Sequence, residues 1–532
     1  MLNSRCPYVF IFILFCAYIV HGHQYGMDGK NEVVGLLESG RMHEVEQRIK
    51  NEEDINPQNK GYINELKSHL AFYRGAYAES VNYMHQASIA SPQDESLAHS
   101  LLFYTVIQQN ANDFIQQETE HFVLRFKGKD IILESYMAEA LELSFSVLTA
   151  LFKTIPEEKI VVEVYPNKEE FSIASTLTEE TLKRSGAIGI CKFHRLMILS
   201  PRALLMGYRW MDALSHELIH LLINQVSRFN TPLWLHEGIA RYYELTWRCD
   251  QENPLDYLTS GTRAQLMDAV HNDTLIPFKR MSPSMVYLKN QDEVSLAFSE
   301  VSNMIEYIST QYHKDAPIQL LEGLQINEQK NNFKKILGIS EKALEKKWKK
   351  YLQSLPYEGN KGAIEETYIF EESIDEIQSF VGADVQGKVR LGDKFRKSGR
   401  YNVALIQYKE ALEKEPENPI ILTKYARCLS QLNKGEEENE ALEKAIKSNP
   451  NYVTSYVLLA GYLYKAGLAE EALKYYREAN AINPFNPIIH KNMGKIYLKI
   501  KDNKAAQKEL SAAGVLLPND PEIKKLLTEA YP

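Results

Sequence analysis

Cysteine is scarce in this chain and offers neither a disulfide framework nor a metal site. The sequence has five cysteines in 532 residues, and two of them lie within the first 22 residues. Cys191, Cys249 and Cys428 remain, an odd number at wide spacing, which predicts buried thiols and at most one bridge. A metal ion would therefore have to be held by histidine and carboxylate side chains.

An excess of positive charge is also missing. Lysine and arginine number 61 against 70 aspartates and glutamates, which gives a formal net charge of -9. A nucleic-acid-binding protein needs a basic face, so the composition predicts no nucleic-acid partner. The hydrophobic content of 44% and the charged content of 25% are those of an ordinary globular protein.

Long apolar runs are absent after the N-terminus. The run Tyr8–Val20 follows Arg5 and precedes small and polar residues. It is too short for a comfortable membrane span, and its layout is that of a secretory signal peptide at 1–22, cleaved after Gly22. We therefore expect an extracytoplasmic protein, periplasmic or secreted, with no stable membrane span after signal removal. An uncleaved anchor is the alternative.

The predicted secondary structure of the rest of the chain changes along its length. Residues 23–117 indicate helices, and 70–93 look like one degenerate helical repeat, with Gly75 at its turn. Residues 118–355 mix helical stretches with short β-branched or apolar stretches. Residues 356–384 contain glycine, proline and acidic residues without a clean period, which predicts a linker.

Three stretches of the mixed region are predicted to be strands: His121–Phe126, Lys159–Pro166 and Arg195–Pro201. Helical stretches separate them, and helices dominate after them. The predicted fold class is thus an α+β domain, with a small mixed sheet and active-site helices, flanked by all-α helical repeats.

Residues 385–532 show internal repetition. Prolines and alanines recur with a period of 34 residues, and each unit indicates two helices. The periodic positions are Pro416, Pro450, Pro484 and Pro518, together with Ala411, Ala445, Ala479 and Ala513. This pattern resembles the tetratricopeptide repeat family in four copies, followed by a capping helix. The resemblance implies a superhelix whose concave groove holds a protein or peptide partner.

The stretch "HELIH" carries the chemistry of the mixed region. On an α-helix, residues four apart differ by about 40° and by about 6 Å along the axis, so His216 and His220 share one face and can reach one metal ion. Glu217 lies about 100° away, where it can take a proton from water. The neighbouring residues are uncharged, which favours a buried helix. A structural helix without a metal is the alternative.

A zinc ion needs a third protein ligand. The phrase "RFNTP" predicts a turn after the first helix, with Thr231 as N-cap and Pro232 at the first helical position. The stretch "LWLHEGIARYYE" then predicts a returning helix that places Glu237 on its inner face as the third ligand. His236 is expected to point away and is kept as a rim residue, and it is the alternative for the third ligand.

These motifs resemble the gluzincin metallopeptidases, specifically the peptidase MA-like group that is often joined to tetratricopeptide repeats. The resemblance covers residues 118–355. It implies that His216, His220 and Glu237 bind Zn2+ and that Glu217 is the general base.

Two positions depart from the family pattern. Gluzincins commonly use a downstream tyrosine to stabilise the tetrahedral intermediate, but the matching phrase "LAFSEVSNMIEYI" has Phe298 there. Losing one such donor costs about 3 kcal/mol of transition-state stabilisation. Tyr307, Tyr312 and Tyr287 are the candidate substitutes.

The second departure is Arg241, which stands where some related families have an acidic residue that orients a metal-binding histidine. An arginine cannot accept that hydrogen bond. Asp212 is the candidate for this role.

The predicted strand that begins at Arg195 lies just before the motif helix. By the resemblance, such a strand borders the cleft and pairs with an extended peptide. The preceding phrase "GAIGI" lacks the glutamate with which the aminopeptidase branch binds a free amino terminus. This favours an endopeptidase.

The sequence therefore predicts a secreted or periplasmic zinc metallopeptidase that hydrolyses protein substrates recruited by its repeats. The first alternative is a scaffold or assembly factor that binds zinc and cleaves poorly, which Phe298 favours. The second is a purely structural repeat protein, against which the His216, His220 and Glu237 constellation argues.

Overall fold

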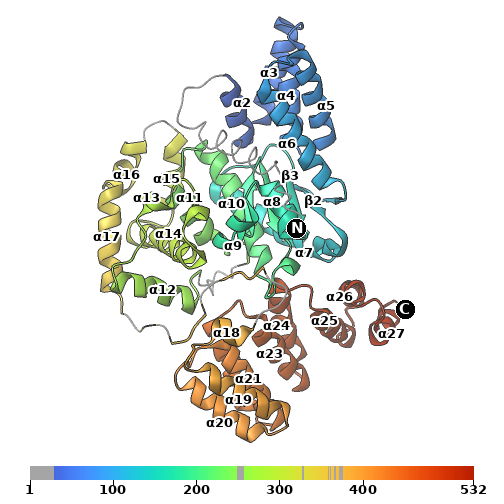
Figure 1. Cartoon of the computed structure of the whole chain (residues 1–532), viewed down its shortest axis with the longest axis vertical. Helices are drawn as coiled ribbons and strands as arrows, with labels where there is room; N and C mark the ends of the chain where they lie inside the picture. The colour runs from blue at the N-terminus through green and yellow to red at the C-terminus, as the bar shows by residue number, and fades with distance from the viewer. Residues whose placement is uncertain are drawn as a thin grey trace, which may run out of the picture.

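The structure, a computed structural model, describes residues 29–248, 257–325, 329–356, 359, 361–364, 367–370 and 375–531. The predicted signal peptide at 1–22 and Cys249 lie outside these residues. Within these ranges no helix combines the length and the apolar character needed to cross a bilayer. N-terminal helices lie at one end of the molecule, a mixed domain in the middle and helical repeats at the other end (Figure 1).

The N-terminal part consists of helices that pack as successive pairs. They are α2 (Gly29–Glu38), α3 (Met42–Ile55), α4 (Lys60–Tyr73), α5 (Tyr77–Ala90) and α6 (Glu95–Ala111). Gly75 turns the chain between α4 and α5 at a φ of 71°, a conformation that favours glycine. The repeat-like stretch 70–93 is therefore part of a helical hairpin.

A buried arginine joins these helices to the central sheet. Arg195 is 1% exposed, and its guanidinium lies 4.5 Å from the ring centroid of Phe72 and 5.0 Å from that of Tyr77. Its counter-charge is the buried Glu163, 4.0 Å away, which also accepts a hydrogen bond from Tyr77. Because an unpaired buried charge is costly, this cluster holds the N-terminal helices against the sheet.

The central sheet has five strands in the order β1-β2-β3-β5-β4. They are β1 (Ile115–Glu118), β2 (Phe122–Phe126), β3 (Ile160–Tyr165), β4 (Gly189–Lys192) and β5 (Arg195–Leu199). The pairs β2–β3 and β3–β5 are parallel, whereas β1–β2 and β4–β5 are antiparallel. The strands β2, β3 and β5 lie within the three stretches predicted to be strands.

The prediction that the strand from Arg195 borders the cleft is wrong. The strand β5 lies between β3 and β4 and has both edges paired. The edge strand on that side is β4, where Ile190 pairs with Met197 in antiparallel register. A strand at β4 was hard to predict because it is four residues long and begins with a glycine.

Helices surround the sheet and build the rest of the central domain. The first group is η1 (Gly128–Leu133), α7 (Glu134–Phe152), α8 (Lys168–Ser175), α9 (Glu179–Ser185), η2 (Pro201–Ala203), α10 (Trp210–Ser227) and α11 (Leu233–Tyr243). The helix α10 packs against α7, β4 and β5, and α11 packs against α14. The second group is η3 (Thr246–Arg248), α12 (Ser260–His271), α13 (Phe278–Met281), η4 (Met285–Tyr287), α14 (Gln291–Gln311), α15 (Ala316–Glu322), η5 (Gly323–Gln325), α16 (Gln329–Leu337) and α17 (Glu341–Ser354).

The segment predicted to be a linker makes contacts with both neighbours. It includes the short helix α18 (Glu376–Phe380). Its Ile369 carbonyl accepts a hydrogen bond of 3.2 Å from the amide of Leu205, and the Tyr368 amide donates to Gln291 Oε1 at 2.8 Å. Residues 367–370 therefore lie against the central domain.

Four helical hairpins and a closing helix follow. They are α19 (Gln386–Lys397) with α20 (Tyr401–Leu412), α21 (Pro419–Gln431) with α22 (Gly435–Ser448), α23 (Val453–Lys465) with α24 (Ala469–Ile482), α25 (Pro487–Lys499) with α26 (Asn503–Leu516), and α27 (Pro521–Ala530). The periodic alanines Ala411, Ala445, Ala479 and Ala513 are all fully buried. Small side chains at these positions let the paired helices approach closely.

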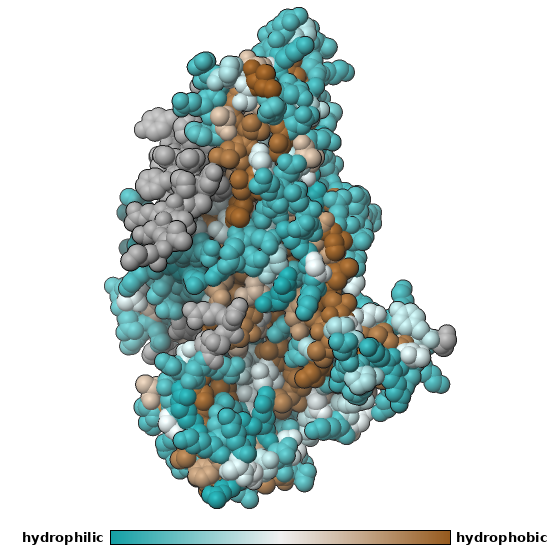
Figure 2. Space-filling view, turned by 45° about the vertical axis from the view of Figure 1, so that its right-hand side comes forward, coloured by the Kyte–Doolittle hydropathy of each residue, from teal (hydrophilic) through white to brown (hydrophobic). Residues whose placement is uncertain are grey.

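The repeats dock directly onto the central domain. Gly207 has a φ of 69°, and a Cβ atom at this position would lie 2.3 Å from the carbonyl oxygen of Ile482. That carbonyl accepts a 3.0 Å hydrogen bond from the amide of Tyr208. Farther along, Tyr136 donates to Glu509 at 2.6 Å. Hydrophobic residues gather on the visible face where the central domain meets the repeats (Figure 2).

We expect Gly207→Ala to destabilise this junction. Gly467 also has a positive φ, 86°, but has nothing within 4 Å of an added Cβ, so Gly467→Ala is a matched control. Both changes incur about 1–2 kcal/mol of backbone strain, and Gly207→Ala adds a clash of about 1–3 kcal/mol. Thermal unfolding should show a larger loss for Gly207→Ala. Equal losses would contradict the docking contact.

Candidate metal and catalytic site

The helix α10 positions three polar side chains of the motif on its cavity side. Its opposite sides are buried, with Leu214, Leu218 and Leu222 each fully inaccessible. The rings of His216 and His220 lie 4.6 Å apart between centroids and are almost perpendicular. This is the arrangement expected for residues one turn apart on a rigid, packed helix.

The helix α11 brings Glu237 to the two histidines. Glu237 Oε2 lies 3.3 Å from His220 Nε2 and 3.7 Å from His216 Nε2. The next residue, Gly238, allows the close approach of α11 to α14, because a Cβ atom there would lie 2.7 Å from the carbonyl oxygen of Val301. Glycine within "HEGIA" therefore serves helix packing.

The start of α11 differs from the prediction. The helix begins at Leu233, and Pro232 occupies the N-cap position. The hydroxyl of Thr231 is buried and has no hydrogen-bond partner among the described residues, so Thr231 does not cap the helix. The fixed φ of proline and the packing of α11 position the helix without that hydrogen bond.

The donor set fits a divalent metal ion. One ligand atom from each of His216, His220 and Glu237 lies within 4.8 Å of the others. Ligands about 2.0–2.2 Å from a common zinc ion are separated by up to about 4 Å, so only small side-chain adjustments are needed. Two imidazoles and one carboxylate with space beside them are the ligands of a catalytic zinc site.

Electrostatics in the site also favour a cation. Burial disfavours the imidazolium, yet the hydrogen bonds to Glu237 and Glu244 raise the pKa of His216 to about 10. Burial acts against the charged form of Glu237 as well, but His220 and His216 hold the pKa of this carboxyl well below its usual range. A metal cation beside Glu237 and Glu244 would supply the positive charge that these carboxylates favour.

Glu217 stands beside the three ligands and is 5% exposed. Its Oε2 atom has no hydrogen-bond partner among the residues that the structure describes. A Cβ atom on Gly189 of β4 would lie 2.5 Å from Glu217 Oε1, so the absence of a side chain at 189 makes room for the carboxylate. Burial raises the pKa of Glu217 against the opposing charges of His220 and His216, which suits a general base.

Glu244 orients His216, a role that the sequence patterns did not predict. Its Oε2 atom accepts a hydrogen bond from His216 Nδ1 at 2.9 Å, and its Oε1 atom accepts from Arg241 at 2.7 Å. Glu244 comes seven positions after Glu237, which places both on the same side of the helix about two turns apart. That spacing was the signal available in the sequence.

The candidate Asp212 does not orient a ligand. Its carboxylate accepts two hydrogen bonds of 2.7 Å from Arg248 and one of 3.2 Å from Trp247. Arg241 cannot orient the histidine itself, but it donates a hydrogen bond to Glu244, which does. The orienting acid is therefore present three residues later than the family pattern suggested.

His236 is not one of the three grouped ligands, and it lies closer to them than predicted. Its ring stacks on that of His220 at 4.5 Å between centroids, and its Nε2 atom lies 3.0 Å from Asn224 Oδ1. Burial and the neighbouring His220 lower the pKa of His236 to about 3. This neutral ring supports the position of His220.

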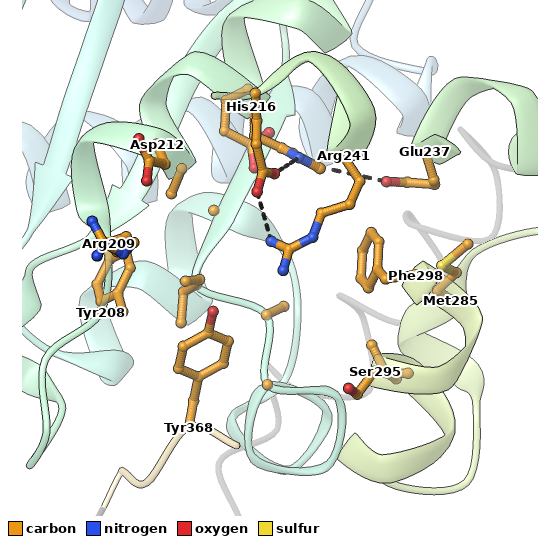
Figure 3. Close-up of a pocket in the computed structure, with 18 of the residues that line it drawn as sticks. Tyr208, Arg209, Asp212, His216, Glu237, Arg241, Met285, Ser295, Phe298 and Tyr368 are labelled. Carbon is orange, nitrogen blue, oxygen red and sulfur yellow. Dashed lines mark hydrogen bonds and ion pairs between the residues drawn. The ribbon is translucent and has the colours of Figure 1, made fainter. Parts of the chain in front are cut away.

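The site opens into a cavity of about 500 Å³. Most of the lining residues belong to the central domain, and Tyr368 also contributes. The repeats contribute four residues: Pro450, Asn451, Tyr456 and Glu478. Phe298 of α14 lines it beside His216, with 6.1 Å between ring centroids. Arg241 and the hydroxyl of Tyr368 project into the cavity near Phe298 (Figure 3).

None of the three tyrosines suggested to replace the missing donor lines this cavity. Tyr287 is 60% exposed, and Tyr307 packs against Tyr351. The tyrosines in the lining are Tyr208, Tyr257, Tyr368 and Tyr456. Three of them donate hydrogen bonds within the protein. Tyr208 donates to the Leu199 carbonyl, Tyr257 to Glu306 and Tyr456 to the Pro450 carbonyl.

Comparison with known families confirms both resemblances. Residues 157–354 match the family model of the Peptidase MA superfamily. Residues 463–530 match the model of the Tetratricopeptide repeat. The central domain and the last hairpins thus each correspond to a known family.

Individual relatives match only part of the chain. Stress-induced-phosphoprotein 1 of Caenorhabditis elegans is 24% identical over 27% of this chain and 43% of its own length. Small glutamine-rich tetratricopeptide repeat-containing protein 2 of Mycosarcoma maydis is 23% identical over 24% of this chain and 34% of its own. The chain therefore spans less than half the length of these relatives.

Solved structures of repeat proteins are also similar over short stretches. A thermophilic TPR protein of Thermus thermophilus is 28% identical over 28% of this chain and 81% of its own, with a TM-score of 0.24. The MamA protein is 19% identical over 28% of this chain and 80% of its own, with a TM-score of 0.27.

We expect Glu244→Gln to weaken Zn2+ binding by about 10- to 100-fold, because the orienting carboxylate of a metal-binding histidine would be lost. Asp212→Asn also replaces a carboxylate by an amide in the same cavity, but Asp212 contacts none of the three candidate metal ligands. This variant should leave the affinity for Zn2+ unchanged. Competition titration with a Zn2+ chelator measures both. A larger effect of Asp212→Asn would reverse the assignment.

Proposed function

We propose that this chain, in which a Peptidase MA superfamily domain is joined to tetratricopeptide repeats, is a zinc-dependent metallopeptidase that hydrolyses peptide bonds in protein substrates. The observation that carries the proposal is the grouping of His216, His220 and Glu237 around one point of a cavity, with Glu217 beside them. A purely structural role gives no reason for this set of buried charges.

His216, His220 and Glu237 would hold the zinc ion, with Glu244 fixing the tautomer and orientation of His216. Bound zinc supplies Lewis acidity that polarises the scissile carbonyl and acidifies water. Glu217 accepts a proton from the attacking water and delivers it to the leaving amine. Its buried carboxylate and raised pKa suit both transfers.

The edge strand β4 is the surface on which an extended substrate would lie. Residues 186–191 line the cavity, and β4 pairs with β5 along one edge, so its other edge faces the cavity side. Main-chain pairing there would give affinity for extended peptides of varied sequence. No carboxylate occurs among residues 186–191, which favours an endopeptidase over an aminopeptidase.

The repeats would recruit a protein substrate or partner through their concave groove. We further propose that the protein is exported, on the basis of the signal-like residues 1–22, and acts in the periplasm or outside the cell.

Phe298 supports a second candidate, a zinc-binding scaffold with little activity. It lines the cavity beside His216 and cannot donate a hydrogen bond. Zinc in the purified protein without cleavage of any unfolded protein would favour this candidate. Absence of bound zinc or any other metal after reconstitution would contradict both.

Glu217→Gln should abolish peptide cleavage and retain one zinc ion per chain, because Glu217 is a base and not a ligand. Glu237→Gln is the matched change on a ligand, and it should lose both activity and zinc, since a neutral amide binds zinc more weakly. Elemental analysis and digestion of reduced, carboxymethylated lactalbumin measure the two properties. Undiminished cleavage by Glu217→Gln would refute the mechanism.

Phe298→Tyr should raise kcat by up to about 100-fold if the new hydroxyl reaches the oxyanion. Tyr368→Phe removes the hydroxyl that points into the same cavity and is the paired variant. If Tyr368 already serves as the donor, Phe298→Tyr will be neutral and Tyr368→Phe will lower kcat. Rate constants on one lactalbumin-derived peptide distinguish these results.

A further inference from the structure

The cavity side of α10 connects the metal ligands to the repeats. Its N-cap residue and five of its helical residues line one cavity, namely Arg209, Asp212, Ala213, His216, Glu217 and His220. The seven steps from Arg209 to His216 span about 10 Å along the helix axis. An extended peptide rises about 3.3 Å per residue, so about three residues of a bound chain cover that distance.

The hairpin α23–α24 and residues 450–451 just before it form the wall at the Arg209 end of this cavity. Arg209 donates to Asn451 Oδ1 at 3.0 Å, to the Pro450 carbonyl at 2.8 Å and to Glu478 Oε2 at 2.9 Å. It also contacts the hydroxyl of Tyr456 at 3.1 Å. All four partners line the same cavity as the metal ligands.

Glu478 is the charged residue among the four that the repeats contribute to the cavity lining. Its side chain is 40% exposed, whereas that of Arg209 is 15% exposed and Tyr456 is 4% exposed. A second arginine, Arg248, lies 3.9 Å from Glu478 and is itself paired with Asp212 of α10. The carboxylate is therefore held in place by the central domain while part of it remains available to a bound chain.

We infer that the wall formed by Pro450, Asn451 and Glu478 is a specificity subsite of the peptidase, which contacts the substrate about three residues from the scissile bond on one side. This inference rests on the proposed peptidase function. It assigns the repeats a direct part in substrate binding at the cleft, in addition to any partner bound in their groove. Glu478 acts as a specificity-determining residue and takes no part in bond cleavage.

The test uses the full-length, zinc-loaded protein and synthetic peptides that span one bond cleaved in carboxymethylated lactalbumin. Each peptide is lengthened on one side at a time, from one to five residues beyond the bond. Glu478→Ala should raise KM roughly fivefold, the effect of one lost hydrogen bond, for peptides with three or more residues on the wall side. The kcat and the KM of shorter peptides should not change.

Two further variants make the result specific. Glu478→Gln keeps the shape and hydrogen-bonding capacity and should restore most of the lost affinity. Glu471→Ala makes the same change at an exposed position of α24 that does not line the cavity, and it should match the wild type at every length.

An equal effect of Glu478→Ala on peptides of all lengths, or no effect, would overturn the subsite while leaving the peptidase function intact. Failure of the zinc-loaded wild type to cleave lactalbumin or any peptide would instead overturn the peptidase function, and the subsite with it.

Discussion

Pairing with a group of opposite charge lets Arg209, Asp212 and His216 remain largely buried on the cavity side of α10. An isolated charge inside a protein costs several kcal/mol or more, so burial demands pairing. Glu237 lies between the imidazoles of His216 and His220, and Glu244 joins His216 to Arg241. A metal ion bound at this point would add positive charge beside these carboxylates and would therefore be stabilised by them.

The same requirement extends from the central domain into the repeats. Asp212 is paired with Arg248, and Arg248 and Arg209 both face Glu478 of α24. Without the repeats, Arg209 would lose the side chains and the carbonyl that satisfy its guanidinium. The repeats are thus an integral wall of the cavity, which explains why a glycine at 207 meets the repeat backbone so closely.

The parts of the fold predictable from sequence are those set by local periodicity. The 34-residue spacing of buried alanines defines the helical hairpins, and runs such as "KIVVEVYP" identify the central strands because both sides of β3 are buried. His216 and His220 could be predicted for the same reason, since helical spacing alone places them together. Glu237 could be added because the turn before Leu233 predicts a second helix that returns beside the first.

The remaining features depend on contacts between distant segments, which local patterns do not encode. The edge strand β4 is stabilised by pairing with β5 and by the space that Gly189 leaves for Glu217, and neither is visible in the four letters "GICK". Tyr368 enters the cavity from a segment with no periodicity, and Glu478 lies 258 residues after His220 of α10. Such residues reach the cavity only because their segments dock onto the central domain. The candidate metal ligands are therefore set by the local sequence of α10 and α11, whereas the far wall of their cavity exists only once the repeats have docked onto the central domain.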